Sequence, residues 1–514
     1  MRRKEALFSM QALCNNTLKQ ARIQGPERVI QFGEGNFLRG FVDWMLDRAH
    51  EDQIYDGSVV VVQPIETGLV DVLNAQDGLY HLVLRGYEAG EMRTEERLIQ
   101  CVSRGLKAYE EWEQVLECAA DPNIDVMISN TTEAGIVYSA ADSLTDQPPK
   151  SFPAKVCAYL YHRYKTFGGD PALGMAIIPC ELIEANGSTL RSIVLRLAEE
   201  WDLEAGFMEW LQEANDFVST LVDRIVTGFP GDEEAADMCE RFGFEDRLLD
   251  TGEIFHLWVL EGTERAARRF PMHKLGLNVH WVEDMTPYRT QKVRILNGAH
   301  TSTVALAHLA GHKTVRQTVE GDIGGRYLRR VLFDEIIPSM DADPVQMEQY
   351  AEQVLQRFLN PYIRHRWLDI SLNSIAKYKA RVLPSLRAHL HRGQVPQLLA
   401  FSMACLLRFY KGEELTEAGL TGTCADETYL IRDDRRVLEF FAAAHKQDWD
   451  DRTLVKKALG REEFWGEDLN QYTGLCQLVT RYVGDISKQG AKATAVKILE
   501  AGDKEDVYSH KRTG

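Results

Sequence analysis

The 514-residue sequence predicts an α/β domain over residues 1–285, with a short N-terminal extension, followed by a multi-helical domain over residues 286–514. Three observations predict this fold class. The chain is longer than one hydrophobic core usually organises. Before about residue 286, short runs rich in Val and Ile alternate with amphipathic segments, as in a parallel sheet covered by helices. After it, strand patterns become sparse and apolar residues recur at helical spacing.

The expected elements follow from these patterns. In the α/β part, strands are expected over residues 28–33, 58–63, 80–85, 94–102, 125–129 and 174–179. Helices are expected there over residues 41–51, 106–120, 151–167 and 188–200. In the second part, helices are expected over residues 292–311, 327–337, 345–359, 368–388, 395–410, 436–445, 469–484 and 491–502.

Composition limits the classes of partner. A net charge of −18 argues against nucleic acid or an anionic membrane as the main partner, but a few basic groups can still hold a small anion. No apolar run reaches about 18 residues, so no membrane span is expected, and the N-terminus lacks the apolar core of a signal peptide. Nine scattered cysteines without a CxxC pair are typical of reduced thiols. We therefore expect a cytoplasmic protein without a metal site.

A glycine-rich turn links the first strand to the first helix. Strand, glycine turn and helix together form a setting in which backbone N–H groups can approach a pyrophosphate. The spacing is GxGxxxxG, with the third glycine displaced from GxGxxG, so an ordinary β–α turn is the alternative. The candidate cofactor-binding residues here are Gly33, Glu34, Gly35, Asn36 and Phe37.

Two further strand ends bear on the cofactor. The second strand ends in Gln63-Pro64, with Glu66 nearby and no adjacent arginine, which favours NAD over NADP. The strand over residues 125–129 leads into small polar residues, at the end of the sheet where open α/β folds bind ligands. Thr132 and Glu133 in that segment are further cofactor candidates, with an exposed loop as the alternative.

The stretch QKVRILNGAHTSTVALAHLAG at residues 291–311 carries the clearest chemistry. It places Lys292, Asn297 and His300 within an otherwise apolar run. In an α-helix, these offsets put the three side chains within an arc of about 140°, so one face can present them together. An amine, an amide and an imidazole suit a carbonyl reaction. A surface lysine beside two polar helix residues is the alternative.

Charged residues elsewhere are less specific. Asp223-Arg224 is most often a structural ion pair, so a functional Asp223 is the minority interpretation. Basic residues gather in the stretches NPYIRHR at 360–366 and KYKAR at 377–381. Such groups suit a substrate carboxylate, which a guanidinium can bind with two hydrogen bonds, although a solvated helix face is the usual explanation.

Taken together, the motifs resemble the polyol-specific long-chain dehydrogenase family, which includes the mannitol dehydrogenases. They occur in family order and cover roughly residues 27–385. Leu38 and Phe41 depart from the GxGxFHRAH turn of polyol relatives and mark a different branch. The motifs are GEGNFLRG at 33–40, SNTTEAGI at 129–136, NG at 186–187, VDRI at 222–225, KVRILNGAH at 292–300 and FLNPYIR at 358–364.

The resemblance implies a role for each matching residue. Lys292 is the expected general acid/base, Asn186 and Asn297 donate to the developing oxyanion, and His300 orients the substrate or the lysine. Asp223, Arg364 and Lys377 are expected on the substrate side. A lysine can serve near neutral pH only if its pKa is lowered, and the apolar surroundings and Arg294 are expected to lower it.

The resemblance also implies a fold and an activity. The fold is an N-terminal Rossmann-type domain and a C-terminal helical domain with the active site in the cleft between them. The expected activity is NAD-dependent reduction of a sugar acid, a hexuronate, to an aldonate, by a monomer or weak homo-oligomer. Alternatives are a relative acting on fructuronate, mannitol or arabinitol, and a non-catalytic NAD(H) sensor. A sensor would need none of Lys292, Asn297 and His300.

Overall fold

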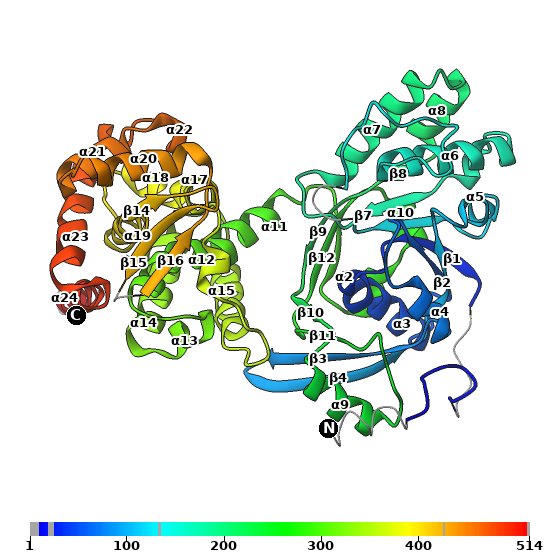
Figure 1. Cartoon of the computed structure of the whole chain (residues 1–514), viewed down its shortest axis with the longest axis horizontal. Coiled ribbons are helices and arrows are strands. Elements are labelled where there is room, and N and C mark those ends of the chain that lie inside the picture. Colours follow the sequence, from blue (N-terminus) through cyan, green and yellow to red (C-terminus); the bar gives the residue numbers. More distant parts are fainter. Residues whose placement is uncertain (1–9, 19–24, 132–134, 425–426, 511–514) are drawn as a thin grey trace. The chain divides into compact units, whose positions relative to one another are not determined.

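The computed structural model describes residues 10–18, 25–131, 135–424 and 427–510, without the side chains of 504–510. The chain divides into two compact units, Met1–Thr286 and Pro287–Gly514. Figure 1 shows strands and helices mixed in the first unit, whereas helices dominate the second. The predicted fold class, a Rossmann-type domain followed by a helical domain, is therefore confirmed.

A six-stranded parallel sheet forms the centre of unit 1. Its order is β5-β2-β1-β6-β7-β8, which in chain order is the 3-2-1-4-5-6 arrangement of a dinucleotide-binding fold. The order in which successive strands are added to the sheet therefore reverses between β1 and β6, where such folds bind their ligand. The strands are β1 (Glu27–Phe32), β2 (Ser58–Gln63), β5 (Val102–Lys107), β6 (Val126–Ser129), β7 (Ala176–Pro179) and β8 (Asp216–Phe217).

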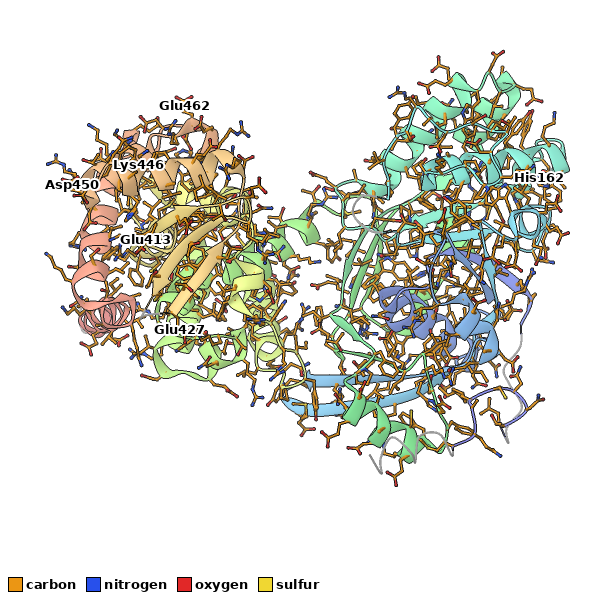
Figure 2. All side chains as sticks on the ribbon, viewed as in Figure 1. His162, Glu413, Glu427, Lys446, Asp450 and Glu462 are labelled. Atoms are coloured by element: carbon orange, nitrogen blue, oxygen red, sulfur yellow. The ribbon has the colours of Figure 1, made fainter. Side chains whose placement is uncertain are left out.

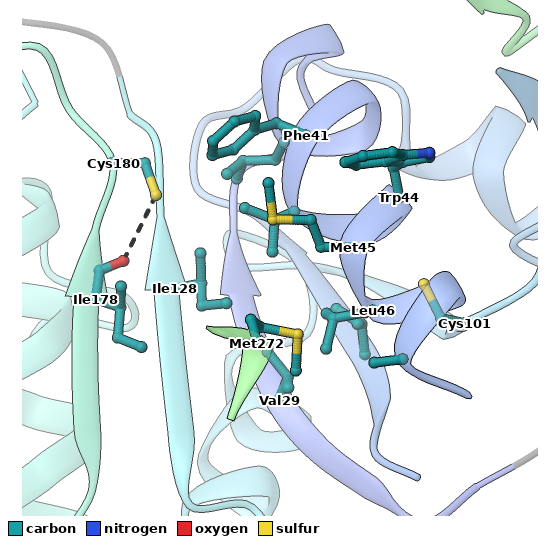
Figure 3. Packing of buried hydrophobic residues seen from close by; sticks show 14 of the residues in the cluster. Val29, Phe41, Trp44, Met45, Leu46, Cys101, Ile128, Ile178, Cys180 and Met272 are labelled. Atoms are coloured by element: carbon teal, nitrogen blue, oxygen red, sulfur yellow. Dashed lines mark hydrogen bonds between the residues drawn. The ribbon is translucent and has the colours of Figure 1, made fainter. Parts of the chain in front are cut away.

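Alternating side chains of this sheet enter two cores. Val29, Ile128 and Ile178 share a cluster with Phe41, Met45 and Leu46 of the first helical run, as Figure 3 shows. The intervening strand residues, such as Ile30 and Met127, pack in a second cluster against four helices of unit 1. Since successive strand residues face opposite sides, both faces are covered and the strands are apolar throughout. These helices are α5 (Trp112–Ala119), α6 (Phe152–Phe167), α7 (Asn186–Glu200) and α8 (Ala205–Glu213).

Two smaller sheets complete unit 1. The expected strands at 80–85 and 94–102 form a long antiparallel hairpin outside the main sheet, within the order β10-β11-β3-β4. The other sheet has the order β13-β12-β9. The helix expected over 106–120 begins only at Trp112, because its first residues belong to β5. The strands are β3 (Tyr80–Glu88), β4 (Glu91–Ile99), β9 (Ser219–Asp223), β10 (Val226–Gly228), β11 (Asp250–Gly252), β12 (Leu257–Glu261) and β13 (Val279–Val282).

Unit 2 is built around α12 (Gly298–Leu309), whose residues Gly298–Ala307 are all buried. A helix that is apolar on all sides is a core helix, and others pack around it. The segment expected as one helix over 368–388 is divided into three. The surrounding helices include α15 (Pro344–Phe358), α16 (Trp367–Ile370), α17 (Ser374–Arg381), α18 (Leu383–His391), α19 (Gln397–Phe409), α20 (Arg435–Lys446), α23 (Leu475–Gln489) and α24 (Ala491–His510).

A three-stranded antiparallel sheet is an addition that the sequence patterns did not predict. It consists of β14 (Gly412–Leu415), β15 (Leu420–Cys424) and β16 (Glu427–Ile431). Figure 2 labels Glu413 and Glu427 on its outer strands. Glu427 pairs with Lys313, which ties this sheet to the segment after α12. Among the described helices, none is long and apolar enough to cross a membrane.

Candidate active site

The glycine turn follows the central strand β1 directly. Gly33 has a φ of +125°, and a Cβ there would lie 2.9 Å from the carbonyl oxygen of Asn130, which follows β6. A side chain at this position would therefore be strained and crowded. A Cβ on Gly35 would meet no atom within 4 Å, so the turn is open on that side. Backbone closeness on one side and open space on the other suit a pyrophosphate.

Arg39 holds the glycine turn in place through hydrogen bonds. It is buried, and its guanidinium donates to the Glu34 carbonyl at 3.2 Å, to Asn36 Oδ1 at 2.6 Å and to the Leu248 carbonyl. It begins a π-helical segment, Arg39–Asp43, within the continuous helical run of residues 36–51. Arg39 lies within the GEGNFLRG motif but was not among the predicted site residues.

Glu34 reaches from the glycine turn to the segment after β2. Its carboxylate accepts a hydrogen bond from the Leu69 backbone N–H, and burial raises its pKa. A Cβ on Gly68 would lie only 1.9 Å from Glu34 Oε1. The Gln63 side chain turns inward, donating to the Ile65 carbonyl at 3.0 Å. An acidic group thus lies near the end of β2, although the strand itself ends in glutamine.

The end of β6 is braced by Glu181, which sequence reasoning passed over. This buried carboxylate accepts from Ser129 Oγ at 3.1 Å and from the Thr131 N–H and hydroxyl at 3.0 and 2.9 Å. Burial raises its pKa. The cofactor candidates Thr132 and Glu133 lie outside the described residues. Cys180, next to Glu181 in the chain, is fully buried.

Asn186 is fully buried at the start of α7 and bonded on both sides of its amide. Its Nδ2 donates to the Pro179 and Glu181 carbonyls at 2.9 and 3.1 Å and lies 3.1 Å from Thr220 Oγ1. Its Oδ1 accepts from the Gly187 and Thr220 N–H groups at 2.9 and 2.8 Å. In this arrangement, the amide hydrogens expected to reach a substrate oxygen are engaged inside the fold.

Asp223 ends strand β9 and is buried. Its neighbour Arg224 donates to the carbonyls of Gly40, Ile254 and Phe255 at 2.8, 3.1 and 3.1 Å. The guanidinium also lies 4.1 Å from the centre of the Trp44 ring. Burial lowers its pKa to about 9. The VDRI motif is thereby fastened to the π-helical segment after the glycine turn.

In unit 2, Lys292–Asn297 forms a π-helical segment between α11 (Thr286–Gln291) and α12. In a π-helix each residue bonds to one five positions away, so Lys292 lies nearly in line with Asn297. The α-helical estimate of about 140° between them is therefore corrected, and the two lie closer together. His300 follows one α-helical turn after Asn297. Single π turns occur frequently at functional sites.

Arg294 does not share this face. Its guanidinium donates to Ser385 Oγ at 3.0 and 2.7 Å and to Ser339 Oγ at 2.9 Å. Burial lowers its pKa. Arg294 was expected to act as a like charge near Lys292, but its hydrogen bonds direct it to α18 and the segment before α15.

His300 lies at the centre of a cluster of rings and cations. It is 8% exposed, and its Nε2 has no hydrogen-bond partner among the described residues. The ring stacks on Phe358 with centroids 4.3 Å apart, with His365 at 5.2 Å and Trp367 at 6.1 Å. Burial, and then the nearby positive groups, hold its pKa well below the usual value. We call His300, Arg357, Phe358, His365, Trp367, Lys377 and Arg381 the His300 cluster.

The basic residues divide differently from the prediction. Lys377 belongs to the His300 cluster and donates to the Ile370 carbonyl at 2.9 Å, and burial lowers its pKa. Arg364 is exposed. Arg357 and Arg381 also belong to the cluster, although neither was selected from the sequence. Arg381 lies in the basic stretch at 377–381, four residues after Lys377 and on the same helical face.

The candidate residues therefore form two groups. The glycine turn, Asn186 and Asp223 belong to unit 1, whereas Lys292, Asn297, His300 and the basic residues belong to unit 2. Within the described part of the chain, no group of three or more His, Cys, Asp or Glu residues could hold a metal ion.

Comparison with known proteins identifies the family. Residues 27–274 match the mannitol dehydrogenase Rossmann domain, and residues 284–487 match the mannitol dehydrogenase C-terminal domain. The chain belongs to the mannitol dehydrogenase family. Its relatives include proteins named altronate oxidoreductase, from Bacillus subtilis (strain 168) at 44% identity, covering 91% of this chain and 94% of the relative, and from Pectobacterium carotovorum at 42%, covering 91% and 96%.

Two solved structures share the fold. Pseudomonas fluorescens mannitol 2-dehydrogenase, in a ternary complex with NAD and D-mannitol, is 21% identical with a TM-score of 0.67, covering 95% of this chain and 100% of that one. A substrate-free D-sorbitol dehydrogenase is 22% identical with a TM-score of 0.78, covering 94% and 100%. Membership of this dehydrogenase family makes the chain an oxidoreductase acting on CH–OH groups with a nicotinamide cofactor.

Proposed function

We propose that this mannitol dehydrogenase family member catalyses the reversible, NAD-dependent reduction of D-tagaturonate to D-altronate in hexuronate breakdown. The observation that carries the proposal is the identity of 44% over 472 residues with a relative named altronate oxidoreductase. The basic His300 cluster supports it, because a sugar acid brings a carboxylate that a neutral polyol lacks.

The residues of unit 1 fit a dinucleotide. The open side of Gly35, the close approach at Gly33 and the Arg39 anchor form a turn that can receive a pyrophosphate. Residues 63–70 (QPIETGLV) contain no basic side chain, and Glu34 lies beside them, which together support NAD over NADP. When bound, the nicotinamide supplies the hydride that reduces the substrate ketone.

The residues of unit 2 stabilise the negative charge on the substrate oxygen and transfer a proton to that oxygen. As the ketone becomes an alcohol, negative charge develops on its oxygen, and the Asn297 amide is assigned to donate a hydrogen bond to it. Lys292, aligned with Asn297 by the π turn, delivers the proton to the same oxygen and takes it back in the reverse direction. His300 stays neutral because burial and nearby cations disfavour its charged form, so it orients the substrate through Nε2.

Asn186 enters this scheme as a positioning residue. Its amide links the end of β7 and Thr220, near the start of β9, to the start of α7, and so it positions the strand that Asp223 ends.

The experiment measures oxidation of NADH by the purified chain with D-tagaturonate, D-fructuronate and D-fructose in parallel, followed by nicotinamide absorbance. We expect the highest kcat/KM with D-tagaturonate, with NADPH at least tenfold poorer than NADH. A clear preference for D-fructuronate or D-fructose would reject the substrate assignment. NADH binding without reduction of any of the three would instead favour the sensor.

A further inference from the structure

Arg381 is a cation without an acidic partner among the residues that the structure describes. It ends α17, where its carbonyl oxygen lies 3.4 Å from the position of a Cβ on Gly298. The end of α17 therefore packs against the start of α12, next to Asn297. The guanidinium is largely buried, and its one hydrogen bond among the described residues is a long one, 3.5 Å from Nη1 to Thr301 Oγ1. The described residues place no carboxylate within ion-pair distance of it.

A buried guanidinium without partners lowers the stability of the fold. A largely buried guanidinium loses hydration and normally recovers that loss through a carboxylate or several hydrogen bonds. Arg294 in the same unit shows the usual solution, with three hydrogen bonds to two serine hydroxyls. Burial lowers the pKa of Arg381, and no charge in the described part of the chain opposes that effect. The arrangement is that of a receptor for an anion which arrives from outside.

A second, independent feature lies beside it. His300 Nε2 is buried and without a partner among the described residues, and the two residues belong to one cluster. Lys377 and Arg357 add positive charge there. The acids near the cluster are engaged elsewhere or at its edge: Asp433 accepts from Tyr410 and the Ile375 N–H and also faces Lys377, and Asp369 faces His365.

We propose that Arg381 binds the carboxylate group of the sugar-acid substrate, beside a substrate oxygen held by His300 Nε2. The proposal rests on the proposed function and deepens it by naming the residue that selects a sugar acid over a neutral ketose. A guanidinium can hold both carboxylate oxygens at once, which a lysine cannot. The exposed Arg364, expected from the sequence, is not needed for this contact.

The test compares Arg381→Gln and Arg381→Lys with Lys379→Gln as the matched control. Lys379 is an exposed cation on the same helix, with its Cε directed toward Gly466. For Arg381→Gln we expect kcat/KM with D-tagaturonate to fall at least 50-fold, mainly through KM, while NADH affinity stays within threefold. Arg381→Lys should recover part of the loss, because it keeps the charge but not the two-point contact. Lys379→Gln should behave as wild type.

Binding of D-altronate, measured by calorimetry in the presence of NAD, gives a readout that needs no turnover. Unchanged melting temperature and NADH affinity show that each variant is folded. Retention by Arg381→Gln of a wild-type KM for D-tagaturonate and of D-altronate affinity overturns the role of Arg381 alone. A wild-type chain that reduces D-fructose but no sugar acid overturns the proposed function, and this inference with it.

Discussion

At the scale of single residues, the amide of Asn186 joins three segments of unit 1 through buried hydrogen bonds. Asn186→Ala would leave the Thr220 N–H without its Oδ1 acceptor. It would also remove one of two donors from each of the Pro179 and Glu181 carbonyls. We expect the free energy of unfolding to fall by about 2–4 kcal/mol, measured by urea titration. Unchanged stability together with a large loss of kcat would instead support direct donation to the substrate.

Gly68 is a second residue with a measurable role. A Cβ there would lie 1.9 Å from Glu34 Oε1 and 2.6 Å from Gln63 Oε1, so Gly68→Ala must displace the carboxylate that links the glycine turn to the segment after β2. We expect the Kd for NADH, measured by fluorescence titration, to rise about tenfold, equivalent to about 1.4 kcal/mol. Gly231→Ala is the control, since a Cβ there meets nothing within 4 Å. Equal affinities for the two variants would contradict this role of Glu34.

Residue types were easier to predict from the sequence than residue partners. Lys292, Asn297 and His300 could be selected because polar groups in an apolar run are chemically conspicuous. The hydrogen-bond partners of Arg224 and Arg294 could not be predicted, because each guanidinium donates to carbonyls or hydroxyls that are distant in sequence. Arg381 belongs to the basic stretch at 377–381, but the sequence could not distinguish it from its neighbours, because its lack of an acidic partner among the described residues is a property of the fold.

At the scale of elements, two π-helical segments carry motif residues, Arg39–Asp43 in unit 1 and Lys292–Asn297 in unit 2. Sequence periodicity predicted helices at both places but could not predict the extra residue in the turn, because π and α turns use the same residue types. In unit 2 that residue determines whether Lys292 faces the same way as Asn297. The geometry of the candidate site thus depends on a detail that hydrophobic patterning does not report.

A buried carboxyl group beside the π-helical segment of unit 1 predicts a pH effect on stability. Asp250 is buried near Arg39 and Gly40, and burial raises the pKa of Asp250 from 3.8 to about 7. The folded chain therefore holds this proton more tightly than the unfolded chain. Its contribution to stability is present at low pH and is lost as the pH rises from about 4 to about 7.

Asp250→Asn replaces the titratable carboxyl group with an amide and therefore removes this pH dependence of stability. Relative to wild type, we expect the variant to gain on the order of 2–4 kcal/mol in free energy of unfolding between pH 4.5 and pH 8, measured by urea titration at each pH. Asp52→Asn, at an exposed position, should show no such trend. A constant difference between Asp250→Asn and wild type at all pH values would contradict the raised pKa of Asp250.

Element boundaries show where sequence patterns lose information. The helix expected over 368–388 is interrupted at Asn373, which adopts a φ of +55°, and again at Val382. Periodicity continues across both breaks because the flanking helices bury the same kind of residue. The β14–β16 sheet escaped prediction because its strands have four or five residues, and only part of each is buried.

At the scale of the whole molecule, the order of strands and helices was the most predictable property. Alternation of Val-rich strands with helices in unit 1 indicated a parallel sheet, and the structure has the corresponding order around β1. The change of pattern near residue 286 falls where the two compact units meet in the chain. The proposed reaction draws on both units, the glycine turn of the first and Lys292 with Asn297 of the second.

The most direct test of this account is the activity of Lys292→Ala with D-tagaturonate and NADH. Loss of the general acid/base should lower kcat by about 10²–10⁴-fold, while the Kd for NADH, measured separately by fluorescence titration, stays within about threefold of wild type. Lys379→Ala, on the exposed face of α17, serves as the control and should keep wild-type activity. Turnover of Lys292→Ala within a few-fold of wild type would contradict the assignment of Lys292 as the proton carrier.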